Sequence, residues 1–340
     1  MATDTITPQN QQIGDELRSA YGQWAKSTGR GQRQVRLPAS SQIEFNQTSA
    51  GIHIHMSDAA VSGNMQTNAA GFEGWALALR LWLKDCGDVI LHWARPEPLN
   101  RHYARFLYRV QRFEELFPDW FRVANPQHLE DCAVRAGGDL FLNIAGATSR
   151  EPSEPKRETE IERGMVSEHG GLIRQKLGLN VVDRQFPVGL YRSRELKDAV
   201  FTGGASAIDI VGVDADRFTL IELKAGKNIM VGALSELLFY AAVVRDAVVS
   251  DNVDSRFKFG GRTNGPSRSH VGPADVQRAK QVRAILMGEH FHPLLEHPSL
   301  FPTLNEAAKR QAGSVPLAFE QWRIDWFGET APPQLEHVAG

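Results

Sequence analysis

Asp209, Glu222 and Lys224 are of the residue types, and stand at the spacing, that could bind a divalent cation and position a water molecule beside it. Two apolar, β-rich runs at residues 207–213 and 218–225 flank a polar turn, which predicts a β-hairpin. With the turn centred between residues 215 and 216, Asp209 and Glu222 oppose each other across the hairpin. Directly opposed Cβ atoms lie about 4.5–5.5 Å apart, and the two-residue period of a strand puts Lys224 on the same face.

Opposed carboxylates destabilise a sheet unless a positive charge neutralises them. Oxygen ligands on rigid strands, with room for water, favour Mg²⁺ or Mn²⁺ over zinc. We therefore predict a metal held by Asp209 and Glu222, with the Leu223 carbonyl as a further ligand. The Lys224 ammonium would orient a metal-bound water or stabilise developing phosphoryl charge. The alternative is that these are solvated positions on a half-exposed hairpin.

The hairpin stands within a regular succession of predicted elements. They are a helix at 158–166, resuming towards 177, strands at 181–189, 207–213 and 218–225, a helix at 233–246, a strand at 282–287, a helix at 305–311 and a strand at 315–320. The order is helix, three strands, helix, strand, helix, strand.

At these residues the chain resembles the PD-(D/E)xK nuclease superfamily, closest to the catalytic domains of NucS-type endonucleases. Asp209 matches the lone acid of the motif, and Glu222-Leu223-Lys224 matches its Glu-x-Lys triplet. The resemblance covers about residues 158–245, and loosely extends to 320. It implies a restriction-endonuclease-like α-β-β-β-α-β core and a Mg²⁺- or Mn²⁺-dependent endonuclease that hydrolyses DNA. One departure is a long insertion at residues 191–206, between the first strand and Asp209.

Members of the superfamily often add a glutamate from the first helix. Helical spacing places Glu162 inside the apolar stripe of the predicted helix, where a carboxylate needs a partner, so we expect Glu162 to complete the acidic pocket. Glu158 and Glu168 are the alternatives. A narrower apolar stripe would leave all three carboxylates in water.

Two groups of arginines are candidate contacts for a nucleic-acid backbone. In a predicted helix at 100–117, Arg101, Arg105, Arg109 and Arg112 fall on one side, beside an aromatic seam, and could track phosphates. The alternative is an exposed face paired with acids such as Glu114 or Glu115. Arg192 and Arg194 lie in the insertion, which could contact DNA or be a solvated loop.

The amino-terminal half is predicted to be a separate α+β domain. Ile52, Ile54 and Met56 alternate with His53 and His55, which predicts a strand, and residues 89–93 predict a second one. The expected division is a flexible arm at 1–45, this domain at 46–148, a linker at 149–157, the nuclease domain at 158–325 and a tail at 326–340. A cluster of His290, His292 and His297 matches no common zinc spacing.

Composition limits the wider function. The 340 residues carry a net charge of −2, so a polyanion must be held by local patches. Two cysteines exclude a disulfide framework and a four-cysteine zinc site. No apolar run is long enough to span a membrane. We expect an unexported cytoplasmic protein that binds DNA without a membrane or organic cofactor; the amino-terminal domain would select substrate, form a homodimer or recruit a partner.

Two rival functions use the same residues. A catalytically inactive relative would be a nucleic-acid or protein binding module, and would take up no Mn²⁺. A different hydrolase would act on small phosphorylated or nucleotide substrates, and would leave DNA intact.

Overall fold

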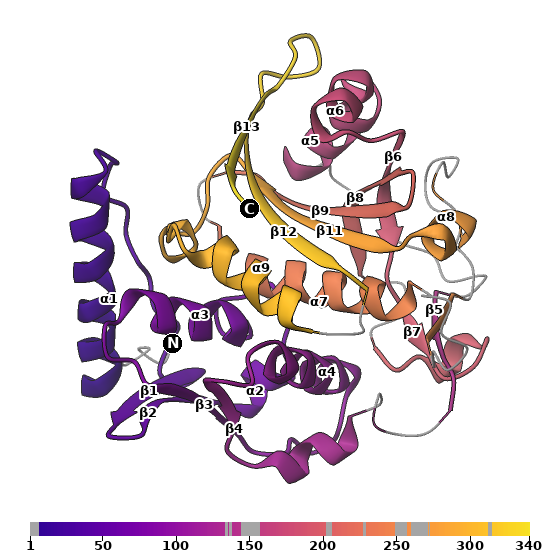
Figure 1. The fold of residues 1–340 in the computed structure, drawn as a ribbon. Helices are drawn as coiled ribbons and strands as arrows, with labels where there is room; N and C mark the ends of the chain where they lie inside the picture. The colour runs from indigo at the N-terminus through magenta and orange to yellow at the C-terminus, as the bar shows by residue number, and fades with distance from the viewer. Residues whose placement is uncertain are drawn as a thin grey trace. The chain divides into compact units, whose positions relative to one another are not determined.

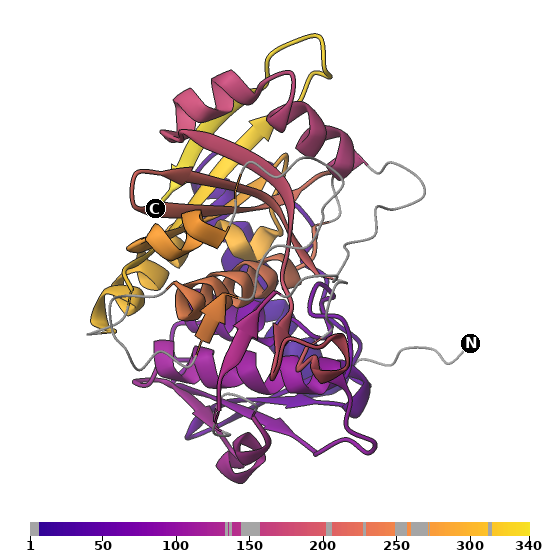
Figure 2. The same ribbon diagram turned by 90° about the vertical axis from the view of Figure 1, so that its right-hand side faces the viewer.

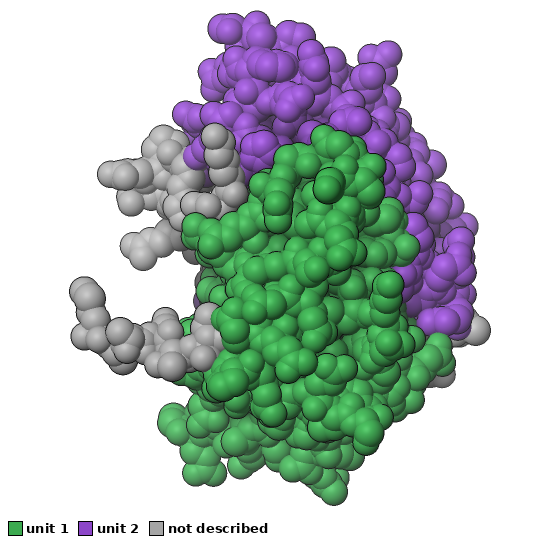
Figure 3. All heavy atoms as spheres, turned by 90° about the vertical axis from the view of Figure 1, so that its left-hand side faces the viewer, with its two compact units in different colours: residues 1–135, 228–236, 291–300 green, residues 136–227, 237–290, 301–340 purple. Residues whose placement is uncertain are grey.

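The protein is a mixed α/β molecule, as the sequence predicts (Figures 1 and 2). The computed structural model describes residues 7–132, 135, 138–143, 157–201, 206–226, 229–248, 257–259, 271, 273–311 and 315–340. The chain divides into two units, coloured separately in Figure 3. Unit 1 comprises residues 1–135, 228–236 and 291–300, and unit 2 the remainder.

Unit 1 contains a four-stranded sheet in the order β1-β2-β3-β4. β1 (Ile43–Thr48) and β2 (Gly51–Met56) form a hairpin, and β3 (Asp88–Trp93) and β4 (Phe121–Val123) continue the sheet in parallel. The helices are α1 (Pro8–Ser27), α2 (Asp58–Val61), α3 (Phe72–Trp82) and α4 (Arg101–Leu116), with 3₁₀ turns η1 (Pro126–Asp131) and η3 (Pro293–Glu296).

The two faces of this sheet differ in chemistry because side chains alternate along each strand. The inner face is buried and packs on α3 and α4, where Phe45 contacts Trp75 and Trp93 contacts Phe106 (Figure 1). The outer face carries the polar residues of β1, β2 and β3. The predicted strand with alternating histidines is therefore confirmed as β2.

The amino-terminal stretch is more ordered than the predicted flexible arm. Thr7 caps α1, and Ile13, Leu17 and Tyr21 of this helix are buried. Asn10 ties the helix to β1, since its amide donates to the Ile43 carbonyl at 3.0 Å. A single buried stripe suffices to dock a helix in a segment of polar composition.

Unit 2 is built on a six-stranded sheet in the order β13-β12-β11-β9-β8-β6. Its elements are α5 (Arg157–Val166), α6 (Gly170–Leu177), β6 (Val181–Pro187), β7 (Leu190–Tyr191), η2 (Leu196–Asp198), β8 (Ala207–Asp214), β9 (Arg217–Lys224), α7 (Gly232–Ala247), α8 (Pro273–Arg278), β11 (Gln281–Gly288), α9 (Leu300–Arg310), β12 (Leu317–Asp325) and β13 (Gln334–Ala339). α7 and α9 each begin in residues assigned to unit 1. A small second sheet joins β10 (Phe257–Phe259), β5 (Leu140–Leu142) and β7.

Five strands of this sheet, β6, β8, β9, β11 and β12, occur along the chain where the sequence predicts strands. β6, β8 and β9 are antiparallel neighbours, and α7 stands between β9 and its parallel partner β11. Asp214 pairs with Arg217, so the hairpin turns at Ala215 and Asp216, as predicted. Figure 1 shows α5 and α6 over one face, where Ile161 and Met165 pack with Ile221 and Leu223.

The ends of unit 2 differ from the prediction. Residues 334–339 of the expected tail form β13, which pairs antiparallel with β12. The expected linker at 149–157 lies outside the described residues except for Arg157, the first residue of α5. In the part of the chain that the structure describes, no helix combines the length and apolarity that a membrane crossing requires.

Candidate active site

Asp209 is the residue of β8 that pairs with neither neighbouring strand. The pairing of β8 with β6 joins Ile208 to Phe186 and Ile210 to Arg184, and passes over Asp209 and Gln185. Its pairing with β9 ends at Ile210 and Ile221. Asp209 Oδ2 instead accepts a hydrogen bond of 2.8 Å from the Leu223 backbone amide. The lone acid therefore bonds to the middle residue of the Glu-x-Lys triplet.

Glu222 and Lys224 form an ion pair on β9. Lys224 Nζ donates to Glu222 Oε1 at 2.5 Å, and the Glu222 side chain is 1% exposed. This ion pair reduces the repulsion that the sequence predicted between the two carboxylates. Lys224 itself neutralises part of the negative charge that the prediction assigned wholly to a bound cation.

Glu162 reaches the same end of the sheet from α5. It is buried, and the side-chain amide of Gln185 donates to Glu162 Oε2 at 2.6 Å. Burial raises the pKa of Glu162 from 4.5 to about 7, although the Gln185 hydrogen bond and the charges of Arg184 and Lys224 act in the opposite direction. Glu162 is thus a buried carboxyl whose charge state changes near neutral pH.

Gln185 is held in place by unusual backbone geometry. Its φ is 52°, a left-handed conformation that is uncommon for a residue with a side chain. A conformation of this kind costs about 1–3 kcal/mol and concentrates at functional sites. The conformation coincides with the gap in the β6–β8 ladder and turns the side chain to Glu162.

Two further carboxylates bind the backbone just beyond β9. Glu158 Oε1 accepts from the Ala225 amide at 3.2 Å, and Glu289 Oε2 accepts from the Gly226 amide at 2.8 Å. Arg157 pairs with Glu289 at 2.5 Å and holds the pKa of that carboxyl below its ordinary value. Glu168, the third helical acid considered, is exposed and bonds Ser167, away from this group.

The oxygen atoms at this site could hold a cation that keeps several of its waters. Asp209, Glu222 and Glu162 do not bring three carboxylate oxygens within 4.8 Å of one another. Mg²⁺ is typically bound through one or two carboxylates, with water completing the octahedron. Asp209, Glu222 and the Leu223 carbonyl are a donor set of that kind.

The predicted arginine stripe on α4 is wrong for Arg105 and Arg109, which are both buried. Arg109 forms a bidentate ion pair with Glu73 of α3 and also donates to the Ala70 carbonyl at 2.8 Å. A buried guanidinium with these partners cannot follow a phosphate backbone. Arg112 pairs with Glu115, the alternative that the sequence left open, and Arg101 is exposed.

The insertion after β6 keeps its predicted arginines on the surface. Arg192 and Arg194 are exposed, and the Arg194 guanidinium lies 5.5 Å from the centre of the Phe141 ring. Both therefore remain candidates for DNA contact.

A cluster of His53, His55 and His92 in unit 1 was not predicted from the sequence. Among the described residues, this is the group whose ligand atoms all lie within 4.8 Å of one another. Burial, followed by the neighbouring imidazoles, lowers the pKa of His92 to about 4. The signal was the alternation of His53 and His55, but His92 stands on another strand, so only the register of β2 and β3 reveals the group.

Comparison of the chain with protein-family models, with curated proteins and with solved structures found no match.

Proposed function

We propose that unit 2 is a Mg²⁺- or Mn²⁺-dependent endonuclease that hydrolyses DNA phosphodiester bonds on a restriction-endonuclease-like core. The observation that carries the proposal is the hydrogen bond between Asp209 and the Leu223 amide. It brings the lone acid of β8 against the Glu-x-Lys triplet of β9, where the β8–β9 pairing stops. An acid pair with an adjacent ammonium is the machinery for metal-assisted attack on a phosphodiester.

The strand order supports the same proposal. An antiparallel β6-β8-β9 meander precedes α7 and the parallel strand β11, and this succession is compatible with the α-β-β-β-α-β core that the resemblance implies. α5 supplies Glu162, the helical acid that the resemblance implies.

Each residue has a definite part in the proposed reaction. Asp209, Glu222 and the Leu223 carbonyl would hold the metal, which when bound stabilises charge on the phosphoryl oxygens. Lys224 would move its ammonium from Glu222 to the attacking water or to the developing phosphoryl charge. Glu162, with a pKa of about 7, would hold or release a proton at this pocket.

The test is cleavage of DNA by the full chain and by two site variants, Asp209→Asn and Lys224→Gln. A panel of single-stranded, duplex, branched and mismatched DNA is incubated with Mg²⁺ or Mn²⁺. We expect metal-dependent cleavage by the wild type, and a loss of at least about 100-fold in each variant, the scale of removing one preorganised charge-stabilising group.

Lys309→Gln is the matched control for Lys224→Gln, because Lys309 is an exposed lysine that also pairs with a glutamate on its own element. It should cleave at the wild-type rate. Equal cleavage by the wild type and both site variants would contradict the proposal. Absence of both cleavage and Mn²⁺ uptake would support the binding-module alternative, and product from mononucleotides with DNA intact would support the small-substrate hydrolase.

A further inference from the structure

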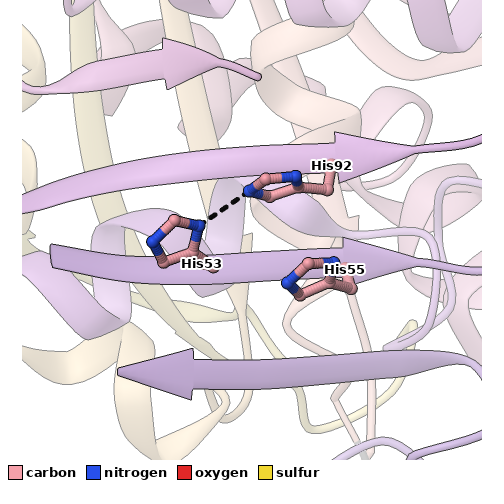
Figure 4. A group of neighbouring side chains, drawn as sticks. All are labelled: His53, His55 and His92. Carbon is pink, nitrogen blue, oxygen red and sulfur yellow. Dashed lines mark hydrogen bonds between the residues drawn. The ribbon is translucent and has the colours of Figure 1, made fainter. Parts of the chain in front are cut away.

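Three histidines of unit 1 share the outer face of the β1-β2-β3-β4 sheet. β2 and β3 run parallel with His55 opposite His92, and His53 lies two residues before His55 on the same face. Figure 4 shows the three imidazoles gathered over the two strands. All three side chains are partly exposed, so a solute can reach them.

The nitrogen atoms are close enough to bind one ion. His53 Nδ1 lies 2.7 Å from His92 Nε2, and one ligand nitrogen from each ring falls within 4.8 Å of the other two. Nitrogen ligands of a tetrahedral zinc lie about 3.3 Å apart, as follows from a Zn–N distance of about 2.0–2.1 Å. The 2.7 Å contact is shorter than that value, and the 4.8 Å limit on the other two distances admits it.

Thr48 orients the first of these imidazoles. Its hydroxyl donates to the Gly51 carbonyl at 3.4 Å and accepts from the Ala50 amide at 3.2 Å. The hydroxyl also lies 3.1 Å from His53 Nε2. With the hydroxyl proton on the Gly51 carbonyl, we assign His53 Nε2–H as the donor of this contact. This assignment leaves the lone pair of His53 Nδ1 directed at His92 Nε2, whose proton a bound metal ion would displace. An outer partner sets the tautomer in the same way in known metal sites.

The charge around the cluster also favours a cation. Glu44 of β1 stands opposite His55, and Asn46 stands opposite His53. On the same face, Arg122 of β4 stands opposite Ile90 and pairs with Asp88 at 3.5 Å, so an acid offsets its charge. A carboxylate beside the histidines, without a competing net positive charge, attracts a metal ion.

Ring stacking is the alternative explanation for the group. The rings of His55 and His92 stack with centroids 4.3 Å apart, and His53 bonds His92. These contacts account for the two pairs separately. They leave one nitrogen of each ring within 4.8 Å of the other two. The ring planes are 15–33° apart, so the imidazoles must turn about their side-chain bonds for all three lone pairs to meet one ion.

We propose that His53, His55 and His92 bind one Zn²⁺ ion, with the fourth coordination position turned away from the sheet and open to water. Three imidazoles suit Zn²⁺ better than Mg²⁺ or Mn²⁺, which prefer oxygen ligands. The site uses no residue of the proposed nuclease centre, which lies in unit 2.

The experiment is a zinc titration of the tag-free full chain by calorimetry, in excess Mg²⁺ so that oxygen-donor sites do not contribute. Co²⁺ then replaces Zn²⁺ as a spectroscopic probe. We expect one zinc ion per chain and an intense visible Co²⁺ band of a four-coordinate site. His55→Gln and His92→Gln should each weaken zinc binding by at least about 100-fold, because losing a ligand costs more than the 10–100-fold typical of losing its outer partner.

Two further variants keep the test independent of folding. Thr48→Val retains all three ligands and should weaken zinc binding by about 10-fold through the lost orientation of His53. His337→Gln removes an exposed histidine of unit 2 and should bind zinc as the wild type does. Zinc binding that is absent in the wild type, or unchanged in His92→Gln, would overturn the proposal.

Discussion

The buried carboxyl of Glu162 makes the protein's stability depend on pH. Because its pKa is raised from 4.5 to about 7, the folded state binds a proton more tightly than the unfolded chain between these values. The free energy of unfolding should therefore fall as pH rises from about 4.5 through 7. The expected loss is about 3 kcal/mol, from 1.36 kcal/mol for each pKa unit.

Denaturant unfolding at a series of pH values, in a chelator, measures this effect. Glu162→Gln keeps the shape of the side chain without a charge, so its stability should be nearly constant across the interval. Glu306→Gln, at an exposed glutamate, should retain the wild-type pH dependence. A wild-type stability that rises with pH over this interval would show that Glu162 is not the controlling group.

Individual residues differ in how far the sequence reveals their role. Asp209, Glu222 and Lys224 follow from alternation and turn symmetry, which are local. Glu162 follows from helical spacing. Gln185 and Glu289 could not be predicted, because the first depends on a left-handed backbone angle and the second on the end of a strand far along the chain.

At the scale of elements, α5 sets the position of Glu162 through close packing at Gly164. A Cβ built on Gly164 would lie 2.2 Å from the Trp326 ring, so the helix touches the residues after β12 there. Gly164→Ala should destabilise the protein by about 1–3 kcal/mol, the usual cost of overpacking. Because Glu162 lies two residues away, DNA cleavage should fall as well.

Gly171 of α6 provides the matched control. A Cβ at Gly171 meets nothing within 4 Å, and the residue is exposed. Gly171→Ala should leave cleavage unchanged and raise stability by about 0.5–1 kcal/mol through lower backbone entropy. Thermal unfolding and cleavage assays on both variants distinguish the two glycines, and similar stability changes in both would contradict the packing argument.

The sequence predicted the order of the elements better than it predicted which face of each element is buried. Helical spacing correctly aligned the α4 arginines, yet it could not show that Glu73, on another helix, would bury Arg109. The ladder of β8 could be anticipated, but its interruption at Asp209 could not, because alternation assumes unbroken pairing.

At the scale of the whole molecule, a net charge of −2 means that the proposed nuclease would depend on local cations to bind DNA. Arg192 and Arg194 are exposed together in the insertion after β6. If each neutralises one phosphate, the double variant Arg192→Gln/Arg194→Gln should reduce the slope of log binding constant against log salt by about 1.8, at about 0.9 per contact.

Binding to duplex DNA, measured in a chelator over a series of salt concentrations, tests this expectation. Lys309→Gln again serves as the control, because it removes one exposed positive charge at another place. An unchanged slope in the arginine variant would show that Arg192 and Arg194 do not contact DNA and that the insertion is a solvated loop.

The boundaries of the two units could not be predicted from the sequence, because unit 1 includes segments from far along the chain. Residues 228–236 and 291–300 belong to unit 1. Trp82 donates to the Leu294 carbonyl at 2.9 Å, and the Val231 amide donates to Asn68 Oδ1 at 2.9 Å. Gly71 and Gly74 lie against Gly232 and Val231 too closely for a larger side chain.

This discontinuity determines when unit 1 can complete its folding during synthesis. A ribosome that has released the first 148 residues has not yet supplied the backbone that Trp82 and Asn68 bind, and a polypeptide that stops there leaves those partners in water. Unit 1 therefore stays incompletely folded, with surface exposed that is later buried, until residue 300 has emerged. Two segments made much later, residues 228–236 and 291–300, are thus needed to complete the unit that the chain begins with.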